Sequence, residues 1–322
     1  MNLIRKMKIY HDISEVESNK NTILSLGTFD GIHQGHRQII KSVVEKASIN
    51  GSRNFLITFH PHPRSVISGD NAVKLLTTTE EKISILESLG IENLLIIKFT
   101  SGFSQISADE FLLNYIIKGI GLKEIVIGFD HHFGKGRSGN NETLKKFGEN
   151  YNFTVSEIGE CRINGETVSS TKIRKALSGG NLESANALLG RYYSIYGNVV
   201  IGDQRGRKLG FPTANIKIDK DKLLPALGIY AAEIIVAENK LFGLLSVGRR
   251  PTFYDAGEII PEAYIFDFNK DIYGKNITVK LVERIRGEEK FGSADELIAQ
   301  MKKDKETGFE ILNRIGSAQV KF

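Results

Sequence analysis

The sequence of 322 residues contains a single cysteine, Cys161, and no tryptophan. One cysteine can form neither an intrachain disulfide nor a cysteine-based zinc or iron–sulfur site. No apolar run is long enough to span a membrane, and the N-terminus has no apolar signal-peptide core. We therefore expect a cytoplasmic protein without a membrane partner.

Histidine is absent from the second half of the chain. All seven histidines precede residue 151, namely His11, His33, His36, His60, His62, His131 and His132. A general base or metal ligand in the second half must therefore be a carboxylate, another oxygen group or lysine, because no imidazole occurs there.

A concentrated positive charge is also missing. The net charge is +5, but lysine and arginine are interspersed with aspartate and glutamate and form no long cationic block. A basic nucleic-acid-binding protein is one alternative, which would bind RNA or DNA with a strong dependence on salt and without turnover. Phosphorylated small molecules account for the surplus charge equally well, so we predict no nucleic-acid partner.

The first half of the sequence alternates between strand and helix patterns. Apolar, β-rich runs cover residues 22–29, 53–59, 92–99 and 123–129. Capping patterns at Thr78–Glu81 and Ser107–Glu110 begin two of the intervening helices. Such an alternation predicts an α/β domain with a parallel sheet covered on both faces, which we assign to residues 1–184. Ligands bind these sheets beyond the carboxyl ends of the strands.

The second half consists of β patterns without long helices between them. These patterns cover residues 192–201, 229–237, 241–247, 262–268 and 276–283. Successive short strands joined by Gly, Pro and Asn turns predict an antiparallel barrel. A third capping pattern, Ser293–Glu296, begins a terminal helix. We assign this second domain to residues 185–322.

A glycine-rich turn, Gly-Thr-Phe-Asp-Gly-Ile-His-Gln-Gly-His at 27–36, is the first candidate phosphate site. Its glycines let the backbone approach a ligand, and the following helix offers unpaired N–H groups and a positive dipole end. His33 and His36, three residues apart, can lie side by side there. The spacing matches neither the dinucleotide fingerprint nor the Walker loop. The residues predicted to bind ATP or phosphate in this turn are Gly27, Thr28, Phe29, Asp30 and Gly35.

A second candidate phosphate-binding stretch is Ser-Ser-Thr-Lys-Ile-Arg at 169–174. An ordinary helix N-cap would need only one serine or threonine. Three consecutive hydroxyl residues followed by an arginine fit the oxygens of a triphosphate better. The predicted ligands are Ser169, Ser170, Thr171 and Arg174.

The segment after the second strand, Phe-His-Pro-His-Pro at 59–63, contains two histidines two residues apart. This spacing could indicate a metal site. However, two prolines stiffen the loop, and no carboxylate or cysteine stands nearby in the sequence. We interpret the segment as a rigid wall for a substrate.

The most specific motif is Gly-Asp-Gln-Arg-Gly-Arg-Lys-Leu-Gly-Phe-Pro-Thr-Ala-Asn at 202–215. Its glycines and basic residues predict a loop that cradles phosphate. The alternative, a plain Gly/Arg-rich hairpin loop, leaves the Pro-Thr-Ala-Asn ending unexplained. Thr213 and Asn215 present two oxygens to a hard cation, and Mg²⁺ prefers oxygen ligands while it retains water. The predicted phosphate ligands are Gly206, Arg207, Lys208, Gly210 and Pro212.

These motifs resemble those of known enzymes. His-x-Gly-His at 33–36 and the serine-rich stretch are similar to motifs of the nucleotidylyltransferase superfamily. The segment 206–215 closely resembles the signature of bacterial riboflavin kinase. Further matches are Leu-Pro-Ala-Leu-Gly-Ile-Tyr at 224–230, Val-Gly-Arg-Arg-Pro-Thr-Phe at 247–253 and Tyr-Gly-Lys at 273–275. The chain as a whole therefore resembles the bifunctional riboflavin kinase/FAD synthetase family.

The resemblance implies two sequential reactions and the folds that carry them. A C-terminal antiparallel barrel would phosphorylate riboflavin with ATP, which gives FMN and ADP, with Mg²⁺ as cofactor. A Rossmann-like nucleotidylyltransferase domain would transfer AMP from a second ATP to FMN, which gives FAD and pyrophosphate. His33 and His36 would stabilise the charged transition state of this second step. Flavin contacts are expected at Phe59, His62, Pro63 and Asp130.

The kinase base must be a carboxylate that accepts the proton of the ribityl hydroxyl, because the second half has no histidine. The resemblance assigns this role to Glu262, with Glu258 and Asp267 as competitors. The chain departs from the family pattern at His131, where an aromatic residue usually follows Phe129 by two positions and contributes to the substrate wall.

Two further alternatives keep the same fold. One is a riboflavin kinase with an impaired adenylyltransferase half, and the other is an adenylyltransferase for a different cofactor with a barrel that only binds. The intact motif at 33–36 argues against the first, and the Pro-Thr-Ala-Asn ending argues against the second. The sequence sets no oligomeric state and is compatible with self-association.

Overall fold

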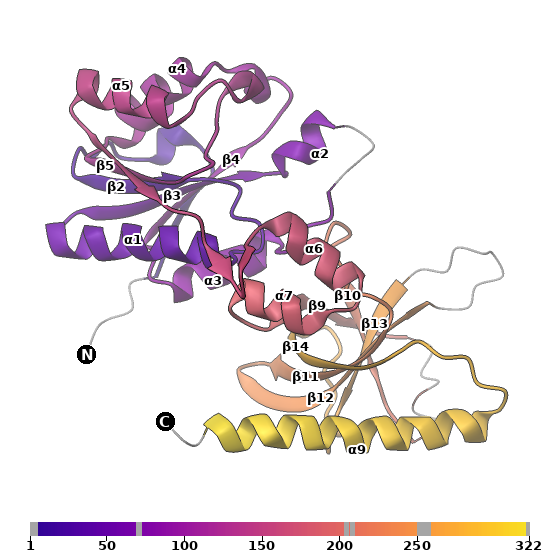
Figure 1. Cartoon of the computed structure of the whole chain (residues 1–322). Helices are drawn as coiled ribbons and strands as arrows, with labels where there is room; N and C mark the ends of the chain where they lie inside the picture. Colours follow the sequence, from indigo (N-terminus) through magenta and orange to yellow (C-terminus); the bar gives the residue numbers. More distant parts are fainter. Residues whose placement is uncertain (1–5, 69–72, 203–205, 207–209, 250–258, 320–322) are drawn as a thin grey trace. The chain divides into compact units, whose positions relative to one another are not determined.

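The computed structural model of the protein describes residues 6–68, 73–202, 206, 210–249 and 259–319, and the side chains of 316–319 are not described. The chain divides into two compact units, Met1–Ser170 and Thr171–Phe322 (Figure 1). No helix in the described part of the chain is both long enough and apolar enough to cross a membrane.

The first unit is built on a six-stranded sheet in which every neighbouring pair is parallel, and the strand order is β1-β4-β3-β2-β5-β6. The strands are β1 (Lys8–Tyr10), β2 (Thr22–Leu26), β3 (Arg53–His60), β4 (Asn93–Lys98), β5 (Glu124–Gly128) and β6 (Thr154–Ile158). The chain moves outward from β2 through β3 to β4 on one side and through β5 to β6 on the other. The loop after β2 therefore lies at the topological switch point, where open α/β sheets bind ligands.

Helices and short turns connect these strands. They are η1 (Ile13–Glu15), α1 (Gln34–Asn50), α2 (Pro63–Ile67), α3 (Thr79–Ser88), η2 (Phe103–Gln105), α4 (Ala108–Phe111), η3 (Leu112–Ile120), η4 (Lys135–Arg137) and α5 (Asn141–Tyr151). A small hairpin of β7 (Arg162–Ile163) and β8 (Glu166–Thr167) follows β6.

Both faces of the sheet are covered, which explains the continuous apolar strands. All five residues of β2 are buried. Because side chains alternate along a strand, Leu24 joins the cluster under α4 and η3, whereas Ile23 joins the cluster under α1 and α3. The predicted α/β domain with a parallel sheet is confirmed.

The predicted helix start at Thr78 is confirmed as a full capping box, in which Thr78 and Glu81 bond each other's backbone N–H groups. Ser107 likewise caps α4, but the helix continues as the π-helical segment η3 instead of a regular α-helix. The sequence patterns also missed β1 and β6, which are short strands at the two edges of the sheet.

The second unit is a closed barrel of six antiparallel strands in the order β10-β13-β12-β11-β14-β9. The strands are β9 (Tyr193–Val200), β10 (Ala214–Ile218), β11 (Gly228–Val236), β12 (Asn239–Arg249), β13 (Ile259–Ile265) and β14 (Asn276–Gly287). The helices bounded in the described part of this unit are α6 (Ser170–Ser178), which begins at the unit boundary, α7 (Leu182–Leu189) and α9 (Ala294–Gln319).

The predicted barrel and terminal helix are confirmed, but β10 was not predicted as a strand. The predicted domain boundary between residues 184 and 185 falls inside α7, and it stays a prediction. Within the second unit, Asn186 of α7 donates to the Leu281 carbonyl and accepts from the Tyr193 N–H.

The long helix α9 lies along the outside of the barrel (Figure 1). Ile311 and Leu312 of α9 pack against Ala231 and Leu244 of the barrel, and all four side chains are buried. Gly308 lets the helix approach closely, because a Cβ there would collide with Leu244. The apolar contact therefore fixes one stretch of α9 on β11 and β12.

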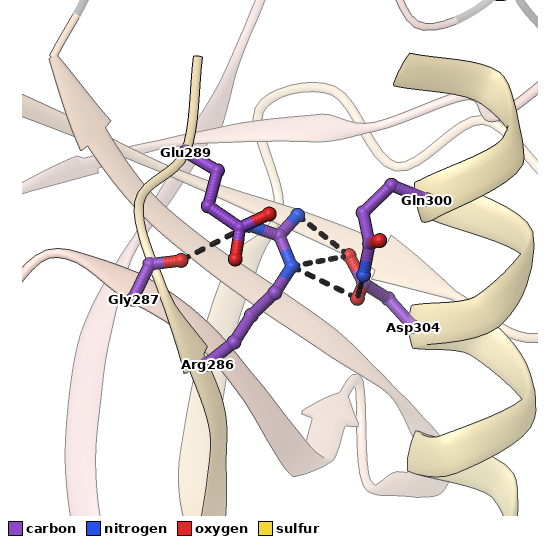
Figure 2. A network of polar contacts seen from close by, with 5 residues as sticks. All are labelled: Arg286, Gly287, Glu289, Gln300 and Asp304. Atoms are coloured by element: carbon purple, nitrogen blue, oxygen red, sulfur yellow. Dashed lines mark hydrogen bonds and ion pairs between the residues drawn. The ribbon is translucent and has the colours of Figure 1, made fainter. Parts of the chain in front are cut away.

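A buried ion pair fixes an earlier stretch of α9. The Arg286 guanidinium at the end of β14 donates to both carboxylate oxygens of Asp304, at 2.7–3.1 Å (Figure 2). Gln300 donates to the same carboxylate at 2.8 Å, and Glu289 lies 3.9 Å from the guanidinium. The side chains of Arg286 and Asp304 are only 15% and 4% exposed, and the hydrogen bonds to Asp304 raise the pKa of Arg286.

Replacing Asp304 by asparagine should loosen α9, because it removes the buried carboxylate and leaves the Arg286 charge with only the half-exposed Glu289, 3.9 Å away, as an anionic partner. Loss of one member of a buried pair costs about 3 kcal/mol or more. We expect the amide protons of α9 to exchange at least about a hundred-fold faster in hydrogen-exchange mass spectrometry.

Asp267→Asn is the matched control, because the Asp267 carboxylate is 85% exposed and pairs with Lys305 of the same helix at 3.9 Å. An exposed ion pair contributes about 0–1 kcal/mol to stability. The amide protons of α9 in this variant should therefore exchange at nearly the same rate as in the parent protein. Equal effects of the two substitutions would contradict the role of the buried pair.

Candidate active sites

The turn after β2 has an unusual backbone. Phe29, Gly31 and Ile32 all adopt positive φ angles, of 45°, 82° and 38°. Such conformations cost free energy at non-glycine residues and persist only where the surroundings fix them. Both Phe29 and Ile32 are buried, so their side chains hold the turn against the core.

Hydrogen bonds from the segment before α3 fix the same turn. The Asp30 carboxylate accepts from the N–H groups of Leu76 and Thr77 at 3.0–3.2 Å, and the Gly31 N–H donates to Thr77 Oγ1 at 3.1 Å. Asp30 is only 2% exposed. Its observed bonds hold the loop, and its predicted contact with ATP stays a prediction.

The two predicted imidazoles of this turn meet at the start of α1. Their rings stack, with centroids 3.7 Å apart and planes 14° apart, and the Phe29 ring makes a T-shaped contact with the His36 ring at a centroid distance of 5.3 Å. His33 is the N-cap of α1, and its Nδ1 accepts from the His36 N–H at 3.4 Å. An accepting Nδ1 leaves the proton of a neutral His33 ring on Nε2, which can donate to an anion.

Two neighbouring glycines lie at van der Waals distance from these rings. A Cβ on Gly35 would lie 3.5 Å from both the His33 ring and the Cys161 Cβ, and a Cβ on Gly27 would lie 3.4 Å from the Phe29 ring. Together with the N-terminus of α1, this turn offers backbone N–H groups, a positive dipole end and imidazole donors. Groups of these kinds bind phosphate in proteins.

Only part of the serine-rich stretch can be related to this turn. The Ser170 hydroxyl donates to the Asp30 carbonyl at 2.9 Å, across 140 residues of sequence. Ser169 precedes it, whereas Thr171 and Arg174 lie on α6 in the second compact unit. The phosphate-binding roles of these residues, and of Thr28, stay predictions.

The segment 59–63, predicted as a rigid wall for a substrate, spans the end of β3 and the start of α2. Phe59 forms ring contacts with Phe99 and Phe103, at centroid distances of 5.8 and 6.1 Å. His62 is the N-cap of α2, where its Nδ1 accepts from the Arg64 N–H at 3.1 Å, and Pro63 is the first helical residue. Flavin binding by these residues stays a prediction. In the described part of the chain, no three His, Cys, Asp or Glu side chains gather as a metal site.

The loop after β5 contains the departure from the family pattern. Asp130, a predicted flavin contact, is exposed, and its carbonyl lies 2.9 Å from His132 Nδ1. The His131 ring stacks on Phe133 with centroids 5.7 Å apart. Burial lowers the pKa of His131 to about 4, so the ring is neutral near pH 7. His131 therefore presents an uncharged flat ring in the place where an aromatic residue is usual.

The sequence patterns missed Lys82 of α3. It is 9% exposed, and its ammonium donates to the Thr28 carbonyl at 2.7 Å and to Thr58 Oγ1 at 3.1 Å. The available signal was its position one helical turn before the buried Leu86. A lysine on the apolar side of a helix needs a buried partner, and the sequence does not show which one.

The predicted kinase residues meet on the barrel. Asn215 of β10 pairs directly with Glu262 of β13, so their side chains lie on the same face of the sheet. The Thr213 hydroxyl donates to Glu262 Oε2 at 2.9 Å. Ser246 of β12 pairs with Glu262 from the other side, and the sequence patterns missed it because it is the one polar residue in the run 241–247.

Glycines in the preceding loop pack against this cluster. A Cβ on Gly202 would collide with the Asn215 side chain, and a Cβ on Gly206 would collide with the Phe211 carbonyl and lie 3.3 Å from Thr213 Oγ1. Gly210 has a positive φ of 84°. The backbone at Gly202 and Gly206 therefore lies too close to Asn215, Phe211 and Thr213 for a larger side chain.

The other predicted kinase residues flank β10 and β13 in the sequence. Pro212 is exposed just before β10, whereas Arg207, Lys208 and the competing base Glu258 lie outside the described residues. Asp267, the other competitor, follows β13, and its exposed carboxylate pairs with Lys305 of α9.

The donor chemistry of the barrel cluster fits a hard cation. It combines a hydroxyl, a side-chain amide and a carboxylate, from Thr213, Asn215 and Glu262. Mg²⁺ binds such oxygen donors through few protein ligands, and phosphate oxygens and water complete its coordination. The cluster would therefore hold Mg²⁺ together with a nucleotide.

The first unit has paired imidazoles at the switch point of a parallel sheet, and the barrel has a cluster of a carboxylate, a hydroxyl and an amide. Together they define the class of the protein, a two-part enzyme of nucleotidyl and phosphoryl transfer. Residues 15–172 match the family described as FAD synthetase, and residues 189–312 match the family described as riboflavin kinase. The chain belongs to the bifunctional riboflavin kinase/FMN adenylyltransferase family. It phosphorylates riboflavin to FMN and adenylylates FMN to FAD, with ATP as the substrate of both steps.

Relatives with this family description span nearly the whole chain. The protein of Listeria monocytogenes serovar 1/2a is 37% identical over 305 residues, which cover 94% of this chain and 96% of the relative. The protein of Escherichia coli K12 is 34% identical and covers 96% of this chain and 97% of the relative. A crystal structure from Streptococcus pneumoniae, named as a macrolide-efflux protein, superposes with a TM-score of 0.84 at 32% identity and covers 94% of this chain and 98% of that chain.

Proposed function

We propose that the barrel carries out riboflavin phosphorylation with Glu262 as its general base. The observation that supports this proposal best is the cluster in which Thr213 and Asn215 adjoin that carboxylate. Glu262 Oε2 accepts from Thr213, and an ionised carboxylate has further lone pairs that can accept the proton of the ribityl hydroxyl. The hydroxyl oxygen then attacks the γ-phosphorus of ATP, the bond to the β-phosphate oxygen breaks, and ADP leaves.

Thr213 and Asn215 are the proposed holders of Mg²⁺ in this site. The cation neutralises charge on the phosphate oxygens when it is bound. The Thr213 hydroxyl can donate its proton to Glu262 and still offer a lone pair to a cation. The hydrogen bond from Thr213 to Glu262 therefore orients both the carboxylate and the threonine oxygen.

The first unit is the proposed adenylyltransferase. An FMN phosphate oxygen attacks the α-phosphorus of ATP, the bond between the α-phosphorus and the bridging oxygen breaks, and pyrophosphate leaves. His33, His36 and the N-terminus of α1 donate to the phosphate oxygens as negative charge develops. No proton needs to leave the attacking phosphate group, so donors and not a base are required.

The partners proposed for the chain follow from these reactions. They are riboflavin, FMN, FAD, ATP, ADP and pyrophosphate, with a cytoplasmic location and no nucleic-acid or membrane partner. Self-association is compatible with this proposal and is not needed for either site.

The test is a flavin time course. The purified protein is incubated with riboflavin, ATP and Mg²⁺, and the flavins are separated by chromatography. We expect FMN to appear first and FAD second. Removal of Mg²⁺ by EDTA should stop the first step, and excess Mg²⁺ should restore it. Unchanged riboflavin in the complete mixture would contradict the proposed function, and FMN formation at the full rate in EDTA would contradict the cation site.

A further inference from the structure

The buried ammonium of Lys82 joins three elements at the carboxyl edge of the parallel sheet. Lys82 extends from α3, Thr28 belongs to the turn after β2, and Thr58 lies near the end of β3. The ammonium donates to the Thr28 carbonyl at 2.7 Å and to the Thr58 hydroxyl at 3.1 Å. The Thr58 hydroxyl donates in turn to the Thr28 carbonyl at 3.1 Å. The Thr28 carbonyl is thus held by two converging donors.

The Thr28 carbonyl immediately precedes the residues with positive φ in the turn after β2. Phe29 has a φ of 45°, and Ile32, one residue before His33, has a φ of 38°. Further along the turn, Asp30 and Gly31 are bonded to the segment that leads into α3. Thr58 and Ser170 each donate one further bond to the turn, and the others come from residues 76–82, so this segment supplies most of the hydrogen bonds that hold the turn before the imidazole pair.

The ammonium is costly to bury. Burial lowers the pKa of Lys82 to about 8, and the opposing effect comes from the Asp30 carboxylate. Two ionisable residues of the same elements have partners of their own: Glu81 of α3 accepts from the Thr78 N–H, and His60 at the end of β3 contacts Thr79 Oγ1. Buried charges of this kind are a recurrent feature of functional sites.

We propose that Lys82 is a positioning residue for adenylyl transfer, which acts through the Thr28 carbonyl to hold the turn and its two imidazoles in the geometry that binds the α-phosphate. The inference rests on the proposed adenylyltransferase role of the first unit. The positive charge also adds to the potential at the phosphate site, because it lies directly behind the backbone of the turn.

The test compares Lys82→Met with Lys82→Arg in the full-length chain. Methionine keeps the length of the side chain but removes its charge and donors, whereas arginine keeps both. For Lys82→Met we expect the kcat of FMN conversion to FAD to fall about 10- to 100-fold. Riboflavin phosphorylation, measured in the same preparation, should stay within about two-fold because it belongs to the other unit. Lys82→Arg should recover part of the lost kcat.

The pH profile separates a charge that acts on the site from a side chain that only fills space. The ammonium is present below about pH 8 and is lost above it. FAD formation by the parent protein should therefore decline as the pH rises through about 8. The profiles of both Lys82 variants should lack this decline, since methionine has no proton to lose and arginine keeps its charge.

Lys46→Met is the matched control. Lys46 is also a bonded lysine of the first unit, but its ammonium contacts Glu124 and Ser156 in β5 and β6, away from the turn. We expect the kcat of FAD formation by Lys46→Met, and its dependence on pH, to match those of the parent protein. An equal loss in this control would overturn the proposal.

Three other results would also overturn the proposal. They are an unchanged kcat in Lys82→Met, a decline near pH 8 that persists in that variant, and loss of amide protection throughout the sheet, which would make the role purely structural. If the proposed adenylyltransferase role itself is wrong, the His33 and His36 variants described below will keep full FAD formation, whatever Lys82→Met does.

Discussion

Replacing Glu262 by glutamine should lower the rate of FMN formation from riboflavin by about 100- to 10,000-fold, which is the usual contribution of a positioned general base. Glutamine has nearly the same shape, and its carbonyl oxygen can still accept the hydrogen bond that Thr213 donates at 2.9 Å. It cannot take the proton of the ribityl hydroxyl near neutral pH. The loss should therefore appear in kcat, measured from initial rates at saturating ATP and riboflavin.

The same variant carries its own control, because it should still convert added FMN to FAD. A second control is Glu283→Gln, since Glu283 is a half-exposed carboxylate of β14 that lies 3.7 Å from Arg314 of α9. We expect this substitution to leave both rates within about two-fold. If Glu262→Gln keeps more than half of its FMN formation, the base is another carboxylate, and Glu258 and Asp267 would be the next candidates.

The second large effect is expected for the imidazole pair. Replacing both His33 and His36 by asparagine should lower conversion of FMN to FAD by about 1,000-fold, because loss of one preorganised donor to a developing anion already costs about 100- to 1,000-fold. FMN made from riboflavin should then accumulate. The effects of the two single substitutions on the activation free energy should not be additive, because the rings stack at 3.7 Å and act on the same phosphate.

Asparagine is chosen for a structural reason. His33 is the N-cap of α1, and asparagine is among the best N-cap residues, so in His33→Asn the side-chain amide oxygen can replace the imidazole Nδ1 as the acceptor. Helix α1 should stay folded while the donating imidazole is lost. His11→Asn is the matched control, because His11 is exposed near the start of the unit. Loss of both activities in a double variant that stays folded would contradict the division of the reactions between the two units.

The fold was largely predictable because its signals are local. Residues 22–29 and 92–99 are apolar along most of their length, and β2 and β4 are buried on both faces. The alternation at 276–283 likewise predicted β14, whose burial alternates over the first part of its length. Each of these patterns arises within one element, so neighbouring residues suffice to detect it.

The missed elements have weak local patterns. Strands β1, β6 and β10 have three to five residues. Strands this short contain too few residues for an alternation of apolar and polar side chains to be detected. The sequence of β10 also overlaps the end of the motif at 202–215. The continuation of α4 as the π-helical η3 has no distinct sequence signal, because the i, i+4 apolar spacing of Leu112 and Ile116 also fits an α-helix.

The sequence by itself determined the residue types of both sites and the family, because these depend on short motifs whose residues are close together in the chain. The pairing of His33 with His36 belongs to this class, since three residues within one helical turn fix it. Histidine is also absent from the second half, which left only carboxylates and other oxygen groups or lysine as candidate bases there.

Only the tertiary structure decided which distant groups meet. Thr213 and Glu262 are 49 residues apart and are joined by the register of β10 against β13. Lys82 and Thr28 are 54 residues apart and are joined because α3 and the turn after β2 pack into the same apolar cluster. Register and packing depend on burying whole elements against one another, and no local pattern specifies the side-chain contacts that result.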